Sequence, residues 1–297
     1  MDHKVHIDKI KNTELIKAPF ELLYIENFLE EETFNDLIND SEINVSDKTY
    51  KDDVLINELV RKNYEIIPFP GTTANKDDYI RWRNSEKNKN DGLCEGIGLT
   101  FRLKESKSKC VSNVLNFFKS EEFFDTLNEK FKSNWNKEKY YYDGGIQKYL
   151  DGYEISPHPD IRKKYLTWML NINPFENSEN EDIHTQYLNT NKEKKYIDLF
   201  FKYNMSIDRC WIPWDWCESV FEQKKNNSLV VFSPSFDTYH AIKCNYNHFK
   251  GQRTQIYGNL WYEKDLKYPL FNWQKLDILK GLEDQVEIKN QRSKKFL

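Results

Sequence analysis

The chain of 297 residues lacks several features that would assign it to a function class at once. No apolar run approaches the roughly 18 residues that a membrane-spanning helix needs. The 44 basic residues do not outnumber the 48 acidic ones, so no positive excess indicates a nucleic-acid backbone as a partner. Neither a GxGxxG loop nor a P-loop is present, which fits a chain without a Rossmann sheet.

Cysteine is also scarce. The five cysteines are odd in number and include no CxxC pair, so neither a disulfide scaffold nor a zinc ribbon is expected. The first twelve residues are charged and lack the apolar segment of a secretory signal. We therefore expect a cytoplasmic protein with free thiols.

Aromatic residues are abundant, by contrast. Eight Trp, 18 Tyr and 19 Phe make up 15% of the chain and can cover a sizeable core, although small aliphatic residues are sparse. This content excludes disorder of the whole chain.

The chain divides into three parts, which we expect to form one compact domain. Residues 1–139 read as a helical or mixed portion, 140–264 as a β-rich core, and 265–297 as a closing helix and tail. Within the core, residues 175–210 are polar and break the β pattern, apart from a short helical stretch near 193–203. We interpret them as a surface insertion that could serve as a lid.

Local patterns predict the main elements. In the N-terminal portion they indicate an extended stretch at 22–25 followed by a helix, a strand at 96–103, and one or two helices over 111–131 with Ser120 as a second cap. The strands predicted for the core are 140–150, 165–172, 219–223, 228–234, 238–244 and 253–262. Strands that follow helices without βαβ alternation favour an antiparallel sandwich or barrel.

A metal-binding pattern stands in this β-rich core. His158 and Asp160 occupy positions i and i+2, which share one face of a strand, so an imidazole and a carboxylate converge. Pro159 between them cannot donate a ladder hydrogen bond and places the pair at a strand end. A distant imidazole would complete a 2-His-1-carboxylate site, which suits non-haem Fe(II). His240, which follows a Ser-Pro-Ser turn, is the candidate, and His248 is its weaker rival.

The surroundings of this pair resemble a known family. Tyr149-x2-Gly152 precedes His158, and a strand that contains Thr167 and ends in Leu-Asn follows. This order resembles the metal-binding strand of the prolyl-4-hydroxylase-like branch of the Fe(II)/2-oxoglutarate dioxygenases.

The distal half of the core is similar to the same family. Arg253 lies thirteen residues after His240, where the family places an Arg or Lys that holds the far carboxylate of 2-oxoglutarate. Prolyl hydroxylases usually have Lys at this place and at a shorter distance, and Lys250 is a competitor. These departures, with the 175–210 segment, argue against a prolyl substrate.

The resemblance covers residues 140–262 and implies both a fold and a chemistry. It implies a double-stranded β-helix (jelly-roll) core with His158, Asp160 and His240 as iron ligands. It also implies that Fe(II), O2 and 2-oxoglutarate take part, with ascorbate as a reductant, and that succinate and CO2 form while a substrate is hydroxylated.

Several neighbouring residues have two interpretations each. Tyr149 and Asn171 correspond to family positions that contact 2-oxoglutarate, but a core aromatic and a strand-end residue are the alternatives. Arg162 follows Asp160 by two residues and could pair with an anionic substrate, or it could be a solvated charge. Trp211, Trp214 and Trp216 could line a substrate pocket or anchor the insertion.

Three functions follow from this pattern. The first is a hydroxylase that acts on a small metabolite, a peptidyl residue or a glycan precursor. A nucleic-acid demethylase is the second, although that branch carries another Arg six residues after the first, where this chain has Asn259. The third is a catalytically silent β-helix protein that binds a ligand through its tryptophans.

Overall fold

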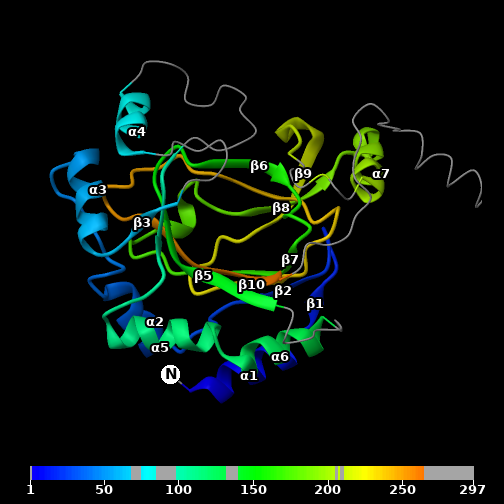
Figure 1. Cartoon of the computed structure of the whole chain (residues 1–297), viewed down its shortest axis with the longest axis horizontal. Helices are drawn as coiled ribbons and strands as arrows, with labels where there is room; N and C mark the ends of the chain where they lie inside the picture. Colours follow the sequence, from blue (N-terminus) through cyan, green and yellow to red (C-terminus); the bar gives the residue numbers. More distant parts are fainter. Residues whose placement is uncertain are drawn as a thin grey trace, which may run out of the picture.

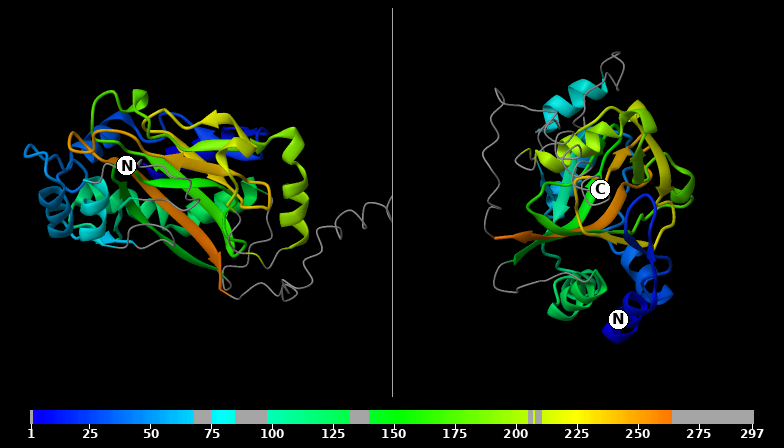
Figure 2. Two further views of the ribbon diagram at one scale, coloured as in Figure 1. Left: turned by 90° about the horizontal axis from the view of Figure 1, so that it is seen from above. Right: turned by 90° about the vertical axis from the view of Figure 1, so that its right-hand side faces the viewer.

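The computed structural model describes residues 2–67, 75–84, 98–131, 140–204, 207 and 211–263 (Figure 1). The predicted helix of 265–297 lies outside these residues. Two antiparallel sheets face each other, and Figure 2 shows them from two further sides. In the ranges described, no helix has the length and apolar character needed to cross a membrane.

The larger sheet has eight strands in the order β1-β2-β10-β7-β12-β5-β4-β3. Its strands are β1 (Leu15–Ile16), β2 (Leu22–Ile25), β3 (Glu65–Ile66), β4 (Thr100–Leu103), β5 (Tyr140–Tyr149), β7 (Lys164–Asn171), β10 (Leu229–Phe232) and β12 (Arg253–Tyr262). The smaller sheet has the order β6-β11-β8-β9. Its strands are β6 (Glu154–His158), β8 (Gln186–Thr190), β9 (Cys217–Glu222) and β11 (His240–Lys243).

From β5 onward the chain supplies four strands to each sheet. β5, β7, β10 and β12 lie side by side in the larger sheet, and β6, β8, β9 and β11 make up the smaller one. The strands before residue 140 extend the larger sheet at both of its edges. No ladder between described strands joins the two sheets, so the predicted barrel is an open pair of facing sheets.

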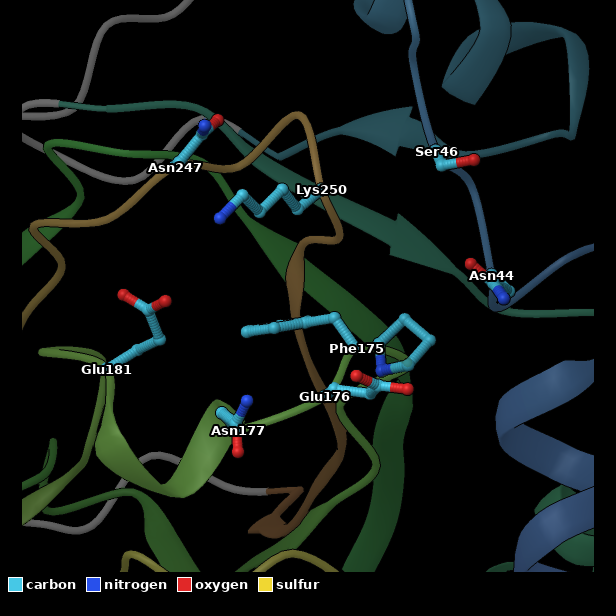
Figure 3. A pocket seen from close by; sticks show the side chains of 9 residues that line it. Asn44, Ser46, Phe175, Glu176, Asn177, Glu181, Asn247 and Lys250 are labelled. Atoms are coloured by element: carbon cyan, nitrogen blue, oxygen red, sulfur yellow. The ribbon is translucent and has the colours of Figure 1, made fainter.

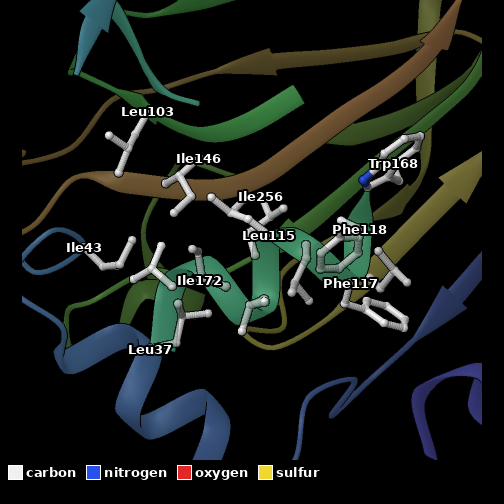
Figure 4. Packing of buried hydrophobic residues seen from close by; sticks show 14 of the residues in the cluster. Leu37, Ile43, Leu103, Leu115, Phe117, Phe118, Ile146, Trp168, Ile172 and Ile256 are labelled. Carbon is white, nitrogen blue, oxygen red and sulfur yellow. The ribbon is translucent and has the colours of Figure 1, made fainter. Parts of the chain in front are cut away.

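Four helices cover the outer face of the larger sheet: α1 (His3–Asn12), α2 (Glu31–Asn39), α5 (Lys109–Phe118) and α6 (Glu121–Lys130) (Figure 1). α3 (Asp52–Arg61) and α4 (Lys76–Arg83) contact each other, and α7 (Tyr196–Tyr203) packs against residues of the smaller sheet. Leu115 and Phe118 of α5 belong to one buried cluster with Ile146, Trp168 and Ile256 of the sheet (Figure 4). This cluster includes side chains from both sides of residue 140, so the predicted N-terminal portion and core share one hydrophobic core.

The stretch 111–131 forms two helices because of Ser120. The Ser120 hydroxyl accepts the backbone N–H of Phe123 at 3.2 Å and so caps the start of α6. α5 buries Val111, Val114 and Phe117 along one face, as an amphipathic helix on a sheet should.

One prediction about the chain was wrong. Residues 175–210 are more than a surface insertion, because β8 lies within them and pairs with both β11 and β9 in the smaller sheet. The sequence did not predict β8, because this strand is short and polar and only Tyr187, Leu188 and Thr190 are buried in it.

Candidate active site

His158, Asp160 and His240 meet at one end of the smaller sheet. β6 ends at His158, β11 begins at His240, and the two residues are paired directly across the ladder. Their ring centroids are 4.5 Å apart, and Asp160 Oδ1 is 3.9 Å from His240 Nε2. One donor atom from each of the three residues lies within 4.8 Å of the other two. The fold thus brings together the predicted ligands, and their binding of iron stays a prediction.

Each imidazole is fixed by a carbonyl of its own chain segment. His158 Nδ1 lies 2.8 Å from the Ser156 carbonyl, and His240 Nδ1 lies 3.0 Å from that of Thr238. Because a carbonyl only accepts, Nδ1 carries the proton in each ring and Nε2 keeps its lone pair. Burial and then the neighbouring His240 lower the pKa of His158 to about 3, and burial lowers that of His240. Both rings are therefore neutral near pH 7, the form that binds metals.

The carboxylate of Asp160 is buried and held at both oxygens. Lys164 Nζ donates to Oδ1 at 2.5 Å, and the Thr167 hydroxyl donates to Oδ2 at 2.6 Å. Burial raises the pKa of Asp160, but the Lys164 ammonium and then the two imidazoles lower it by more, so the net shift is downward. Asp160 is therefore an anion that two side chains of β7 orient. Lys164 was not predicted, because a single Lys at the edge of an apolar strand resembles a solvated charge.

This donor set fits a divalent transition metal. Two neutral nitrogens and one ionised oxygen converge, and three ligands leave coordination positions open, as non-haem Fe(II) oxygenases require. Among the described residues, no other group of three His, Cys, Asp or Glu side chains comes together in this way.

Arg253 begins β12 with a guanidinium that pairs with no acid among the described residues. Its side chain is only 3% exposed, and none of the ion pairs among the described residues includes it. Nε donates to the Ile183 carbonyl at 2.5 Å, and Nη2 donates to the Thr185 hydroxyl at 2.8 Å. A buried cation without a counter-charge is costly, so the site favours an anionic ligand. Ile183 and Thr185 lie in the supposed insertion, where no pattern marked them.

The guanidinium of Arg253 contacts the ring of Tyr149, and the hydroxyl of Tyr246 links the backbones of the two residues. The Arg253 Cζ lies 4.4 Å from the centre of the Tyr149 ring, and the two residues are paired across β5 and β12. The buried hydroxyl of Tyr246 accepts the backbone N–H of Arg253 at 2.7 Å and donates to the Tyr149 carbonyl. Tyr246 therefore fixes the ends of both strands at the predicted cosubstrate site.

We expect Tyr246→Phe to weaken 2-oxoglutarate binding several-fold while leaving Fe(II) affinity unchanged. The variant leaves a buried carbonyl and a buried N–H without this partner, which costs about 1–3 kcal/mol for each group. Equilibrium binding of 2-oxoglutarate measures the effect. Tyr64→Phe is the matched control, because the Tyr64 hydroxyl donates to the Glu42 carbonyl under the helices. Equal 2-oxoglutarate affinity in both variants would show that Tyr246 contributes only to stability.

The structure explains why position 152, part of the family-like pattern, is a glycine. Its φ is +84°, and a Cβ there would lie 2.0 Å from an atom of the Trp82 ring in α4. Arg83 of the same helix forms an ion pair with Asp151. Trp82 and Arg83 of α4 thus hold the turn between β5 and β6 in place.

Asn171 uses its amide group within the protein. Its Nδ2 donates to the Gln223 carbonyl at 3.0 Å, and its Oδ1 accepts Gln255 Nε2 at 2.7 Å. These bonds tie β7 to the loop after β9 and to β12. The predicted contact of Asn171 with the cosubstrate stays a prediction.

The three tryptophans divide into two groups. The Trp214 indole donates to the Glu154 carboxylate at 2.7 Å. Trp214 and Trp216 also pack in a cluster with α7, Tyr239 and Ala241. Tyr239 and Ala241 are the sequence neighbours of His240, so their side chains point to the opposite face of the sheet. These contacts anchor the segment to the outer face of the smaller sheet. Trp211 precedes Ile212, whose backbone N–H donates to the carbonyl of Pro157, the residue before His158, at 2.9 Å.

His248 and Lys250, the alternatives to His240 and Arg253, lie elsewhere in the structure. His248 Nε2 is 2.8 Å from Asp52 Oδ1, and its Nδ1 accepts the backbone N–H of Asp151 at 3.0 Å, so the ring belongs to the contact between α3 and the sheets. Lys250 lines a separate hollow of about 480 Å³ with Glu181 and Asn247 (Figure 3). Among the described residues, no hydrogen bond or ion pair joins the side chain of either residue to the triad or to Arg253.

The structure is similar to solved oxygenases at low sequence identity. A prolyl 4-hydroxylase of Pseudomonas putida shares 8% identity at a TM-score of 0.45, over 88% of this chain and 99% of that chain. A prolyl 4-hydroxylase of Phytophthora capsici shares 12% at 0.40, over 96% and 75%. A prolyl hydroxylase of Trichoplax adhaerens, solved with a peptide fragment of hypoxia inducible factor, shares 12% at 0.36, over 88% of each chain.

No family model and no curated protein matches the chain. At these identities and TM-scores, the likeness to solved structures carries no functional inference. The side chains of the site must carry it instead.

Proposed function

We propose that this chain is an Fe(II)- and 2-oxoglutarate-dependent oxygenase that hydroxylates its substrate. The observation that carries the proposal is the meeting of His158, Asp160 and His240, with both Nε2 atoms unprotonated and the carboxylate ionised. A second buried feature supports the cosubstrate: the guanidinium of Arg253, which pairs with no acid of the part of the chain that the structure describes.

The strand order supports a double-stranded β-helix as the framework. Eight strands, β5 to β12, divide four and four between two facing antiparallel sheets, as in a jelly roll. In this arrangement the proposed metal ligands come from the smaller sheet and the loop after β6, and the cosubstrate residues come from the larger sheet. The cosubstrate would bind between them.

Each residue has a separate task in this proposal. His158, Asp160 and His240 hold Fe(II), and the bound metal supplies the O2 chemistry that couples decarboxylation of 2-oxoglutarate to oxidation of the substrate. Arg253, held by Ile183 and Thr185, binds the far carboxylate of 2-oxoglutarate and so sets the direction in which the cosubstrate lies.

Outside the metal and cosubstrate residues, the β7 side chains support the site. Thr167 and Lys164 keep Asp160 oriented and ionised. The substrate is a small molecule or a peptidyl residue, and ascorbate would keep the metal reduced.

The test is conversion of 2-oxoglutarate to succinate. The purified protein, loaded with Fe(II) without oxygen and then exposed to O2, should form succinate from 2-oxoglutarate, and a chelator should stop it. If the protein binds Fe(II) and 2-oxoglutarate but forms no succinate with any candidate substrate, it is a silent binding protein.

A further inference from the structure

We propose that Lys164 is a positioning residue that acts through Asp160 and makes the metal site favour ferrous over ferric iron. This inference rests on the proposed function and adds to it a means of keeping the metal reduced that is built into the chain. The ammonium contacts a proposed metal ligand directly, because Nζ donates to Asp160 Oδ1 at 2.5 Å. Arg162, two residues earlier, bonds the Phe201 carbonyl of α7 instead, so its contact with a substrate stays a prediction.

A β-bulge in β7 turns Lys164 toward the proposed metal ligands. The register between β7 and β12 shifts at Tyr165, which pairs with no residue of the described β12. Strict alternation would place Lys164 and Thr167 on opposite faces of the sheet, because they are three residues apart. The extra residue puts both side chains on one face, where both bond Asp160. Bulges are common beside active sites, where they re-aim a side chain.

The positive charge of Lys164 acts mainly on Asp160. Asp160 is the only acid among the described residues that forms an ion pair with it. Its other hydrogen-bond acceptor is the hydroxyl of Tyr257 at 2.9 Å. The ammonium lies 5.6 Å from the ring centres of Tyr257 and Trp261, which attract a cation without neutralising it. The side chains of Lys164 and Asp160 are 10% and 5% exposed, so solvent ions screen the charge little.

An ammonium at a metal ligand changes the preference between two charge states of the metal. Its repulsion acts on each positive charge of the metal, so a ferric ion is destabilised more than a ferrous ion. Hydrogen bonds to the ligands and burial of the site are the means by which proteins tune the reduction potential of a metal. Lys164 therefore raises the Fe(III)/Fe(II) potential, and the iron stays ferrous with less need for a reductant such as ascorbate.

The midpoint potential of the bound iron tests the proposal. The full chain is loaded with Fe(II) without oxygen and titrated with mediator dyes, which exchange one electron with each iron, while the EPR signal measures ferric iron. Lys164→Gln should have the lower midpoint potential, so that at a fixed potential the ratio of ferric to ferrous iron rises about tenfold or more. Lys164→Arg keeps the charge and should stay close to the unchanged protein.

Thr167→Val is the matched control, because it removes the other hydrogen bond to Asp160 without changing any charge. If Lys164 merely oriented the carboxylate, the two variants would shift the potential alike. We expect a clearly larger shift in Lys164→Gln. Equal shifts in the two variants, or no shift in Lys164→Gln, overturn the proposal.

A second measurement needs no variant to fold. The midpoint potential of the unchanged protein should lie above that of a small iron complex with two imidazoles, one carboxylate and no ammonium, and a potential at or below it contradicts the proposal. If the protein binds no Fe(II), the proposed function fails and this inference fails with it. If Fe(II) binds and succinate forms but the potential does not depend on Lys164, only this inference fails.

Discussion

Replacing His240 with alanine is expected to abolish Fe(II) binding and all 2-oxoglutarate turnover. The change removes one of three donors and leaves His158 and Asp160 as a two-ligand site. Loss of residues that merely support metal ligands typically costs 10- to 100-fold in affinity, so loss of a ligand should cost more than about 100-fold. Equilibrium dialysis with Fe(II) under anaerobic conditions measures it.

His248→Ala is the control for this experiment. It removes a buried imidazole that bonds Asp52 and the backbone of Asp151, so it should lower thermal stability. Metal binding should remain, because the ring is part of the α3 contact and not of the triad. If His248→Ala loses the metal while His240→Ala keeps it, the assignment of the site is wrong.

Arg253→Ala should weaken 2-oxoglutarate binding about 30- to 1000-fold. Losing a bidentate, charge-assisted pair in a buried place costs on the order of 2–4 kcal/mol. The Fe(II) requirement should change far less, because Arg253 contacts none of the three proposed metal ligands. Titration of succinate formation with 2-oxoglutarate and, separately, with Fe(II) distinguishes the two effects.

Lys250→Ala is the matched cation control for Arg253. Lys250 lines the hollow of Figure 3 and should leave the 2-oxoglutarate requirement as it is. An effect in Lys250→Ala with none in Arg253→Ala would place the far carboxylate elsewhere.

The parts of the fold that follow from local pattern were predictable. Aromatic and branched residues indicate strands such as β7 and β12. The two-residue period of a strand was enough to predict that the side chains of His158 and Asp160 converge. The start of α6 could be predicted because Ser120 caps it through a local bond. For His240, the turn before β11 was the only guide, and the ladder to β6 explains why it lies beside His158.

The rest depends on contacts between distant segments. β8 is a strand because β11 and β9 flank it, and its own sequence is too short and polar to show this. Ile183 and Thr185 matter because Arg253, some 70 residues away, reaches them. Lys164 is explained only by the acid it meets. Such partners are set by the fold, and no spacing in one sequence reveals them.

The site is divided between the two sheets, and this division links metal binding to folding. His158 and His240 belong to the smaller sheet, whereas the side chains that orient Asp160 stand on the larger one. No ladder among the described strands connects the sheets, so the metal would join the two histidines of the smaller sheet to Asp160, which Lys164 and Thr167 hold to the larger one. A ligand that binds only the folded state at a thousand times its Kd adds about 4 kcal/mol to stability. Iron supply would then govern how much folded protein persists, as well as how much of it is active.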